Sequence, residues 1–254
     1  MDNSHFLSDF FKEKGYLDDI NSVILRQIHI NSAKMALSLD KDAFFVNGMV
    51  TFASIINSLN KSNYSWAFIN SYYCIFYLAR TFVAINDYSI VYVNRKPYLI
   101  KIHPNERFTR LNGNSHEVVL NLFKNLFPMD ILIRNDIAEK NPLDWFKQKR
   151  EIINYKLNPF SDPIPPIDLY NYGNNIRSWI SSYLSDSSYM YTFSTEHAYL
   201  AYPIKLFLKI LDYYEMNTQK NIYFNDILMK YLRNNIADDR GPFTVLLNKF
   251  EMLC

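Results

Sequence analysis

Apolar side chains recur at intervals of three and four residues along most of the chain, the spacing of one face of an α-helix. Polar stretches and prolines interrupt this pattern. The spacing predicts helices over residues 4–14, 18–38, 41–59, 64–86, 114–128, 142–157, 168–185, 194–214, 220–235 and 241–252. Residues 22–30 could instead form a short strand, because valine, isoleucine and leucine cluster there. The helix over 64–86 is apolar nearly all round, so we expect it to be central and buried.

Residues 88–112 break the helical pattern. Two β-branched or aromatic runs, 89–93 and 98–102, are separated by Asn94-Arg95-Lys96-Pro97, which is typical of a β-hairpin. The predicted fold class is therefore all-α with one inserted β-hairpin and a C-terminal helical extension.

The longest break between the expected helices is rich in proline. Residues 158–166 contain four of the 10 prolines of the chain and cannot continue a helix. This break predicts three parts: an N-terminal helical segment (1–40), a helical bundle with the hairpin inserted (41–160) and a C-terminal helical region (167–254).

The helix expected over 142–157 has a well-marked start and one charge in its apolar stripe. Asn141 is an N-cap candidate, Pro142 suits the first helical position, and Asp144 places an acid in the first turn. Spacings of three and four residues then bring one set of side chains to one face: Leu143, Phe146, Arg150, Ile153 and Leu157. Either a buried acid such as Glu117 or Asp87 pairs with Arg150, or the arginine meets an anion at a cleft or dimer seam.

Composition and charge narrow the class of protein. The chain has 254 residues, of which 49% are hydrophobic and 17% aromatic, enough for a sizeable core. Its 5 glycines disfavour Gly-rich phosphate loops, and its formal net charge of +2 is too small for general nucleic-acid affinity. An anionic partner would therefore have to be met by a local patch.

The expected hairpin carries such a patch. Between residues 91 and 110 there are five cations against one acid, Glu106. We take Arg95, Lys96, Lys101 and Arg107 as candidate nucleic-acid-binding residues, because phosphate contacts dominate such affinity. A solvated surface hairpin and a docking arm for an acidic protein partner are the alternatives.

Other chemistries lack a sequence signal. Cys74 and Cys254 have no metal-ligand spacing, and the histidines are scattered, so no metal site is expected. No phosphate-binding, dinucleotide or nucleophile-elbow motif is present, so no cofactor is expected. The N-terminus lacks a signal peptide, and no apolar run is long enough to span a bilayer. We therefore expect a cytoplasmic protein that does not enter a membrane.

Three motifs in residues 41–160 resemble the HEPN fold, a small helical bundle of bacterial toxin and antiviral defence systems. Ala67-x4-Tyr72-Tyr73-x2-Phe76-x2-Ala79-Arg80 looks like the second helix of that family. Residues 115–119, Ser-His-Glu-Val-Val, with Leu122 and Phe123 look like its third helix. Residues 149–155, Lys-Arg-Glu-Ile-Ile-Asn-Tyr, fall where the fourth helix carries the family's functional arginine, which matches Arg150.

The resemblance implies either an assembly role or RNA cleavage. Ribonucleases of the family pair the arginine with a histidine four to six residues later, usually at a dimer interface, and cleave RNA without metal. Here Tyr155 stands at that distance from Arg150, and Arg110 and His116 are the only arginine and histidine at the family's spacing. The preferred hypothesis is a non-catalytic binding or assembly subunit, as a homodimer or in a larger complex. The alternative is a divergent ribonuclease with RNA as substrate and Arg150, Tyr155, Arg110 and His116 as candidate catalytic residues.

Overall fold

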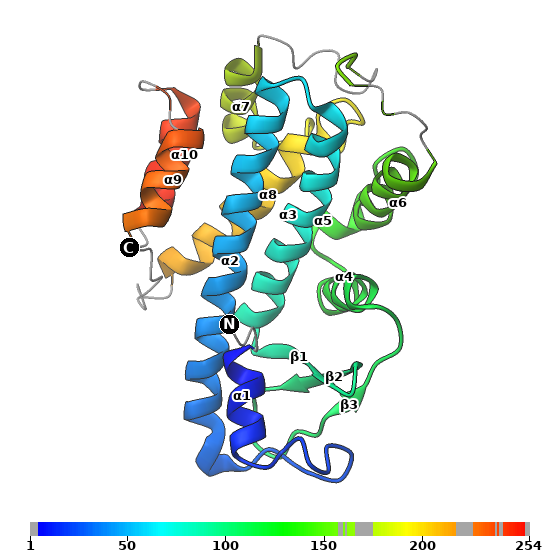
Figure 1. The fold of residues 1–254 in the computed structure, drawn as a ribbon, viewed down its shortest axis with the longest axis vertical. Coiled ribbons are helices and arrows are strands. Elements are labelled where there is room, and N and C mark those ends of the chain that lie inside the picture. The colour runs from blue at the N-terminus through cyan, green and yellow to red at the C-terminus, as the bar shows by residue number, and fades with distance from the viewer. Residues whose placement is uncertain are drawn as a thin grey trace. The chain divides into compact units, whose positions relative to one another are not determined.

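The protein is mostly helical with one small antiparallel sheet (Figure 1). The computed structural model describes residues 5–156, 160, 162–165, 175–216, 226–236, 238 and 241–251. The helices are α1 (Phe6–Glu13), α2 (Ile30–Asn60), α3 (Tyr64–Ile85), α4 (Ser115–Leu126), α5 (Ile131–Arg134), α6 (Pro142–Tyr155), α7 (Ile176–Ser185), α8 (Ala198–Met216), α9 (Asp226–Ile236) and α10 (Pro242–Glu251), with a 3₁₀ turn at Gln27–His29. The strands are β1 (Tyr88–Val93), β2 (Lys96–Lys101) and β3 (Thr109–Arg110). A mainly helical fold with an inserted hairpin is thus confirmed.

The chain forms two compact units that interleave along the sequence. The first unit contains Met1–Val46 and Ala79–Phe127, and the second contains Asn47–Leu78 and Pro128–Cys254. These units cut across the expected segments 1–40, 41–160 and 167–254. The reason is that α2 and α3 each pass from one unit into the other, whereas composition and prolines mark only linear boundaries.

The start of α2 differs from the sequence prediction. Separate helices over 18–38 and 41–59 were expected, but one helix runs from Ile30 to Asn60, and residues 14–22 form turns. The alternative strand over 22–30 is reduced to one bridge between Ile24 and Arg107. Residues 38–41 contain neither proline nor glycine, so nothing local stops the helix there.

The first unit is built on the sheet. Its core packs buried residues of α1, α2 and the sheet together: Leu7, Phe11, Ala33, Leu37, Val91, Tyr98 and Ile100. β1 pairs with β2, and Val93 lies opposite Lys96. The turn is therefore only Asn94-Arg95, shorter than expected, and both residues have positive φ, 50° and 64°. Two left-handed residues are the mark of the type I′ turn that suits strand twist.

The second unit is centred on α8, a helix of the C-terminal region. Nearly every residue between Ala198 and Leu211 is buried, and Phe207 lies 5.5 Å from Phe52 of α2 and 5.2 Å from Phe250 of α10, ring centroid to centroid. The C-terminal region is thus part of the core of this unit and not an addition to its surface. The stretch from Tyr64 to Leu78 of α3, expected to be central, is also largely buried in this unit.

The described part of the proline-rich segment also belongs to the second unit. The carboxylate of Asp162 accepts the backbone N–H of Ser65, at 3.1 Å and 3.4 Å, and so caps the start of α3. Residues 157–159, 161 and 166–174, with Leu157 of the predicted stripe, lie outside the described residues.

Candidate functional site

α6 begins at the residues that the sequence predicted, and this start determines on which face of the helix Arg150 lies. The side chain of Asn141 accepts the N–H of Leu143 at 3.1 Å, and Pro142 occupies the first turn. Trp145 and Phe146 are buried, and Trp145 lies 4.9 Å from the ring of Tyr199 in α8. Capping and burial together fix the rotation of α6, which brings Arg150 toward α3 of the same unit.

The guanidinium of Arg150 lies on an aromatic ring. Its Cζ is 4.9 Å from the centroid of Tyr72, a fully buried residue of α3. Among the residues that the structure describes, none forms an ion pair or hydrogen bond with Arg150, and its Nε is buried. Asp87, one of the acids considered as a partner, instead pairs with Lys34 at 2.7 Å. Arg150 is therefore stabilised by a cation–π contact, which leaves its terminal N–H donors available to an anion.

Tyr155 does not share the face of Arg150. Five residues of α-helix correspond to a rotation of about 140° beyond one full turn. In agreement, Arg150 is partly buried while Tyr155 is 75% exposed. Tyr155 therefore cannot act on a group bound at Arg150 within one copy of α6.

The other predicted pair lies in the first unit. Arg110 is exposed on β3 and forms no hydrogen bond or ion pair with a described residue, so it does not contact His116 in the first turn of α4. Neither predicted pair, Arg150 with Tyr155 or Arg110 with His116, is thus in contact within a unit.

The cations of the hairpin do not share one face of the sheet. Partners across antiparallel strands point to the same side, and neighbouring residues alternate. Lys101 lies opposite Tyr88, with its Nζ 5.4 Å from that ring, whereas Lys96 and Arg110, both exposed, lie on the side of Tyr98. Arg95 is in the turn, and Arg107 is exposed beside β3. Cations spread over both faces and the turn weaken the prediction of a single phosphate-binding surface.

The first unit also contains a charge cluster that the sequence analysis missed. Asp40 of α2 is 2% exposed and accepts the N–H groups of Phe6 and Leu7, at 2.9 Å and 3.1 Å. It therefore caps α1 from another helix. His5 lies 3.7 Å from this carboxylate through Nδ1, and its Nε2 is 3.0 Å from a terminal nitrogen of Arg80.

The protonation of this cluster follows from its contacts. Burial, with a further contribution from the charge of Arg80, lowers the pKa of His5 from 6.5 to about 4. His5 is thus neutral near pH 7, with Nε2 able to accept from Arg80. Burial raises the pKa of Asp40, while the two N–H donors and Arg80 act in the opposite direction. We interpret the cluster as a structural tie between α1, α2 and α3, because Nε2, the nitrogen that a base would use, is occupied by Arg80.

A sequence signal for this cluster did exist. Ala33, Leu37, Asp40 and Phe44 follow spacings of four, three and four residues, so Asp40 interrupts an apolar stripe as Arg150 does. The expected break between helices at residue 40 hid this pattern.

His197, the one histidine of the second unit, is enclosed by aromatic rings. Its Nδ1 is 2.9 Å from the hydroxyl of Tyr183, and its ring is 4.4 Å from Trp179 and 5.0 Å from Tyr191. Burial lowers the pKa of His197, against a smaller opposite effect of Glu196. With 9% exposure, this histidine is not placed to serve as a proton carrier for a bound substrate.

The lowered pKa of His197 predicts a loss of stability in acid. Below its unfolded pKa of 6.5 the unfolded chain binds more protons than the folded one, so the free energy of unfolding falls as the pH decreases. We expect His197→Gln to reduce this dependence below pH 6.5, and the slope that remains is due to His5, whose pKa is also lowered; urea unfolding with tryptophan fluorescence measures the change. His103→Gln, at an exposed position, should keep the wild-type slope. An unchanged slope in His197→Gln would contradict the assignment.

No protein family, curated protein or solved structure matches the chain. Within the described ranges, no three histidine, cysteine, aspartate or glutamate side chains gather in a way that could hold a metal ion. Two helical stretches, residues 27–60 and 64–85, are long and apolar enough to cross a membrane by length and composition. The most apolar windows of these stretches are 44% and 78% buried in the structure, and core helices of soluble proteins meet the same criterion.

Proposed function

We propose that the chain is a non-catalytic binding and assembly subunit of a bacterial antiviral defence or toxin-type system, built on a HEPN-like bundle. The observation that carries the proposal is the environment of Arg150. Its guanidinium rests on Tyr72 and has neither an acid nor a proton carrier beside it among the described residues of its unit. Such an arginine can bind an anion but lacks a partner for proton transfer.

The argument against catalysis is chemical. Cleavage of RNA through its 2′-hydroxyl needs a group that takes a proton and a group that returns one. Tyr155 points away from Arg150, and His197 is enclosed by aromatic rings. A cationic stabiliser alone supplies only part of the required chemistry.

The argument for assembly rests on the hydrogen-bond donors of Arg150 that have no partner among the described residues. A guanidinium backed by a ring is oriented, and its planar set of donors matches a carboxylate or phosphate. Arginine and tyrosine are both enriched among residues that dominate protein interfaces. We therefore infer that an anionic group of a second copy of the chain meets Arg150.

The test measures the oligomeric state of the protein and its RNA cleavage in the same preparations. We expect the purified protein to be a dimer by light scattering, Arg150→Ala to be a folded monomer, and neither to cleave a labelled total-RNA pool in EDTA. Loss of a cation–π contact should cost only about 0.5–2 kcal/mol, so the variant stays folded. Lys156→Ala, an exposed cation at the end of α6, is the matched control and should remain dimeric.

Two results would overturn the proposal. Cleavage by the wild type that is lost in Arg150→Ala would establish the divergent ribonuclease instead. A wild type that is monomeric at every concentration would exclude a homodimer through Arg150.

A further inference from the structure

A second feature of the second unit, separate from Arg150, is a cavity of about 430 Å³. It lies where the end of α2 and the start of α3 meet α7, α9 and α10. Its volume is in the range of small-molecule sites, which usually combine an apolar wall with a few polar groups. The apolar side chains that line it are Ile56, Leu59, Ile176, Ile236 and Phe243.

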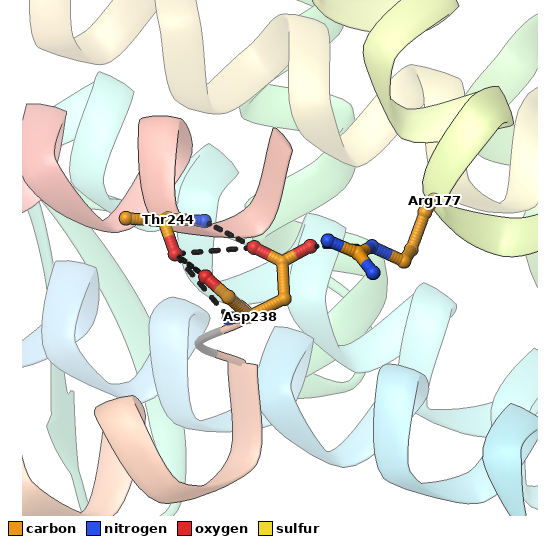
Figure 2. Close-up of polar contacts among 3 residues, drawn as sticks. All are labelled: Arg177, Asp238 and Thr244. Atoms are coloured by element: carbon orange, nitrogen blue, oxygen red, sulfur yellow. Dashed lines mark hydrogen bonds and ion pairs between the residues drawn. The ribbon is translucent and has the colours of Figure 1, made fainter. Parts of the chain in front are cut away.

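One charged pair borders the cavity. Figure 2 shows Arg177 extending from α7 to the carboxylate of Asp238, with Nε 2.9 Å from Oδ2. The other oxygen of Asp238 accepts the N–H and the hydroxyl of Thr244 in α10, both at 3.1 Å. The Asp238 side chain is mostly buried while that of Arg177 is 57% exposed. The acid therefore forms an ion pair with the guanidinium through Nε, and one terminal nitrogen of Arg177 lies close to Gly241, while more than half of the side chain stays exposed.

The backbone of Gly241 lies directly beside this pair. A Cβ added to Gly241 would lie 1.9 Å from Oδ2 of Asp238, so the carboxylate packs directly against the glycine. Only glycine permits so close an approach. Glycine at position 241 thus makes room for the pair, and Thr244 holds the Asp238 carboxylate through two hydrogen bonds.

Several polar groups around the cavity have unused hydrogen-bonding capacity. The amide of Asn60 and the hydroxyls of Ser62 and Tyr64 form no hydrogen bond with any residue that the structure describes. Asn235 donates from its amide nitrogen to the carbonyl of Tyr231 at 2.8 Å, which leaves its side-chain oxygen as an acceptor. Amides and hydroxyls can both donate and accept, which suits the edge of a heterocycle.

We propose that this cavity binds a mononucleotide. The phosphate meets the exposed part of the Arg177 guanidinium, because its charged N–H donors match phosphate oxygens. The base lies against the apolar wall, and its amino group donates to the side-chain oxygen of Asn235. A free anion would use only Arg177, and an uncharged apolar molecule would leave the amides and hydroxyls without partners.

The experiment is calorimetric titration of the full-length protein with AMP, UMP, adenosine and inorganic phosphate at one ionic strength. We expect AMP to bind one per chain, and adenosine and phosphate each to bind at least about tenfold more weakly. Arg177→Gln should weaken the binding of AMP by about tenfold or more and leave the binding of adenosine unchanged. Asn235→Leu should weaken the binding of AMP but not that of UMP, because the base of UMP has no amino group to donate to Asn235.

Control variants separate binding from folding. Arg233→Gln breaks a comparable pair with Glu251, 2.9 Å from Nε to the carboxylate, outside the cavity and should bind AMP normally. Leu59→Trp should fill the cavity and abolish binding, while circular dichroism shows an unchanged helix content. Three results would overturn the proposal. Phosphate could bind as tightly as AMP, or AMP could fail to bind to the folded wild type. Asn235→Leu could also weaken the binding of AMP and UMP equally.

Discussion

Replacing Phe207 by alanine should lower the free energy of unfolding by about 3–5 kcal/mol. Phe207 is fully buried in α8, and its ring lies between those of Phe52 and Phe250. Alanine would remove this ring and leave a cavity among α2, α8 and α10, which cannot close without moving helices. Urea unfolding followed by circular dichroism measures the change.

Phe160→Ala is the matched control for this prediction. Phe160 is 42% exposed, and its ring contact within the described ranges is with Trp66, 6.5 Å between ring centroids. Its loss should cost no more than about 1 kcal/mol. Similar effects of the two substitutions would mean that α8 is not the centre of the second unit, and that the C-terminal region is an addition after all.

Replacing Asp40 by alanine should destabilise the protein by about 2–4 kcal/mol. The carboxylate accepts two N–H groups at the start of α1, one of them buried, and its removal leaves both without that partner. Hydrogen exchange at the amides of Phe6 and Leu7 should accelerate together with the loss of stability.

An exposed acid of the same unit provides the comparison for Asp40. Asp87 pairs with Lys34, and both side chains are at least 40% exposed. Asp87→Asn should therefore change the free energy of unfolding by less than about 1 kcal/mol. If Asp40→Ala were equally mild, solvent would be able to cap α1, and the cluster with His5 and Arg80 would not hold these helices together.

The prediction for Phe207 bears on the proposed function. A binding subunit must hold its contact residue rigidly, and Arg150 depends on α6 packing through Trp145 against Tyr199 of α8. The C-terminal region therefore supports the position of Arg150 on α6. We expect residues 1–165 alone to lose ordered packing around Arg150, because Trp145 would lose its partner.

Local signals account for the features that the sequence analysis predicted well. The start of α6 was predictable because Asn141, Pro142 and Asp144 act within one turn of helix. The hairpin followed from two β-branched runs around a short polar turn. Arg150 stood out because helical periodicity alone reveals a charge in an apolar stripe.

The sequence by itself determined the helical class, the hairpin and the position of Arg150, because caps, periodicity and turns depend on residues only a few positions apart. Only the tertiary structure decided which groups meet: Arg150 with Tyr72, Asp40 with the start of α1, and Arg177 with Asp238. The tertiary structure also decided that the two units interleave along the sequence and that α8 lies at the centre of the second unit. Such contacts join residues dozens of positions apart, and packing of the whole chain selects them from many partners of equal local suitability.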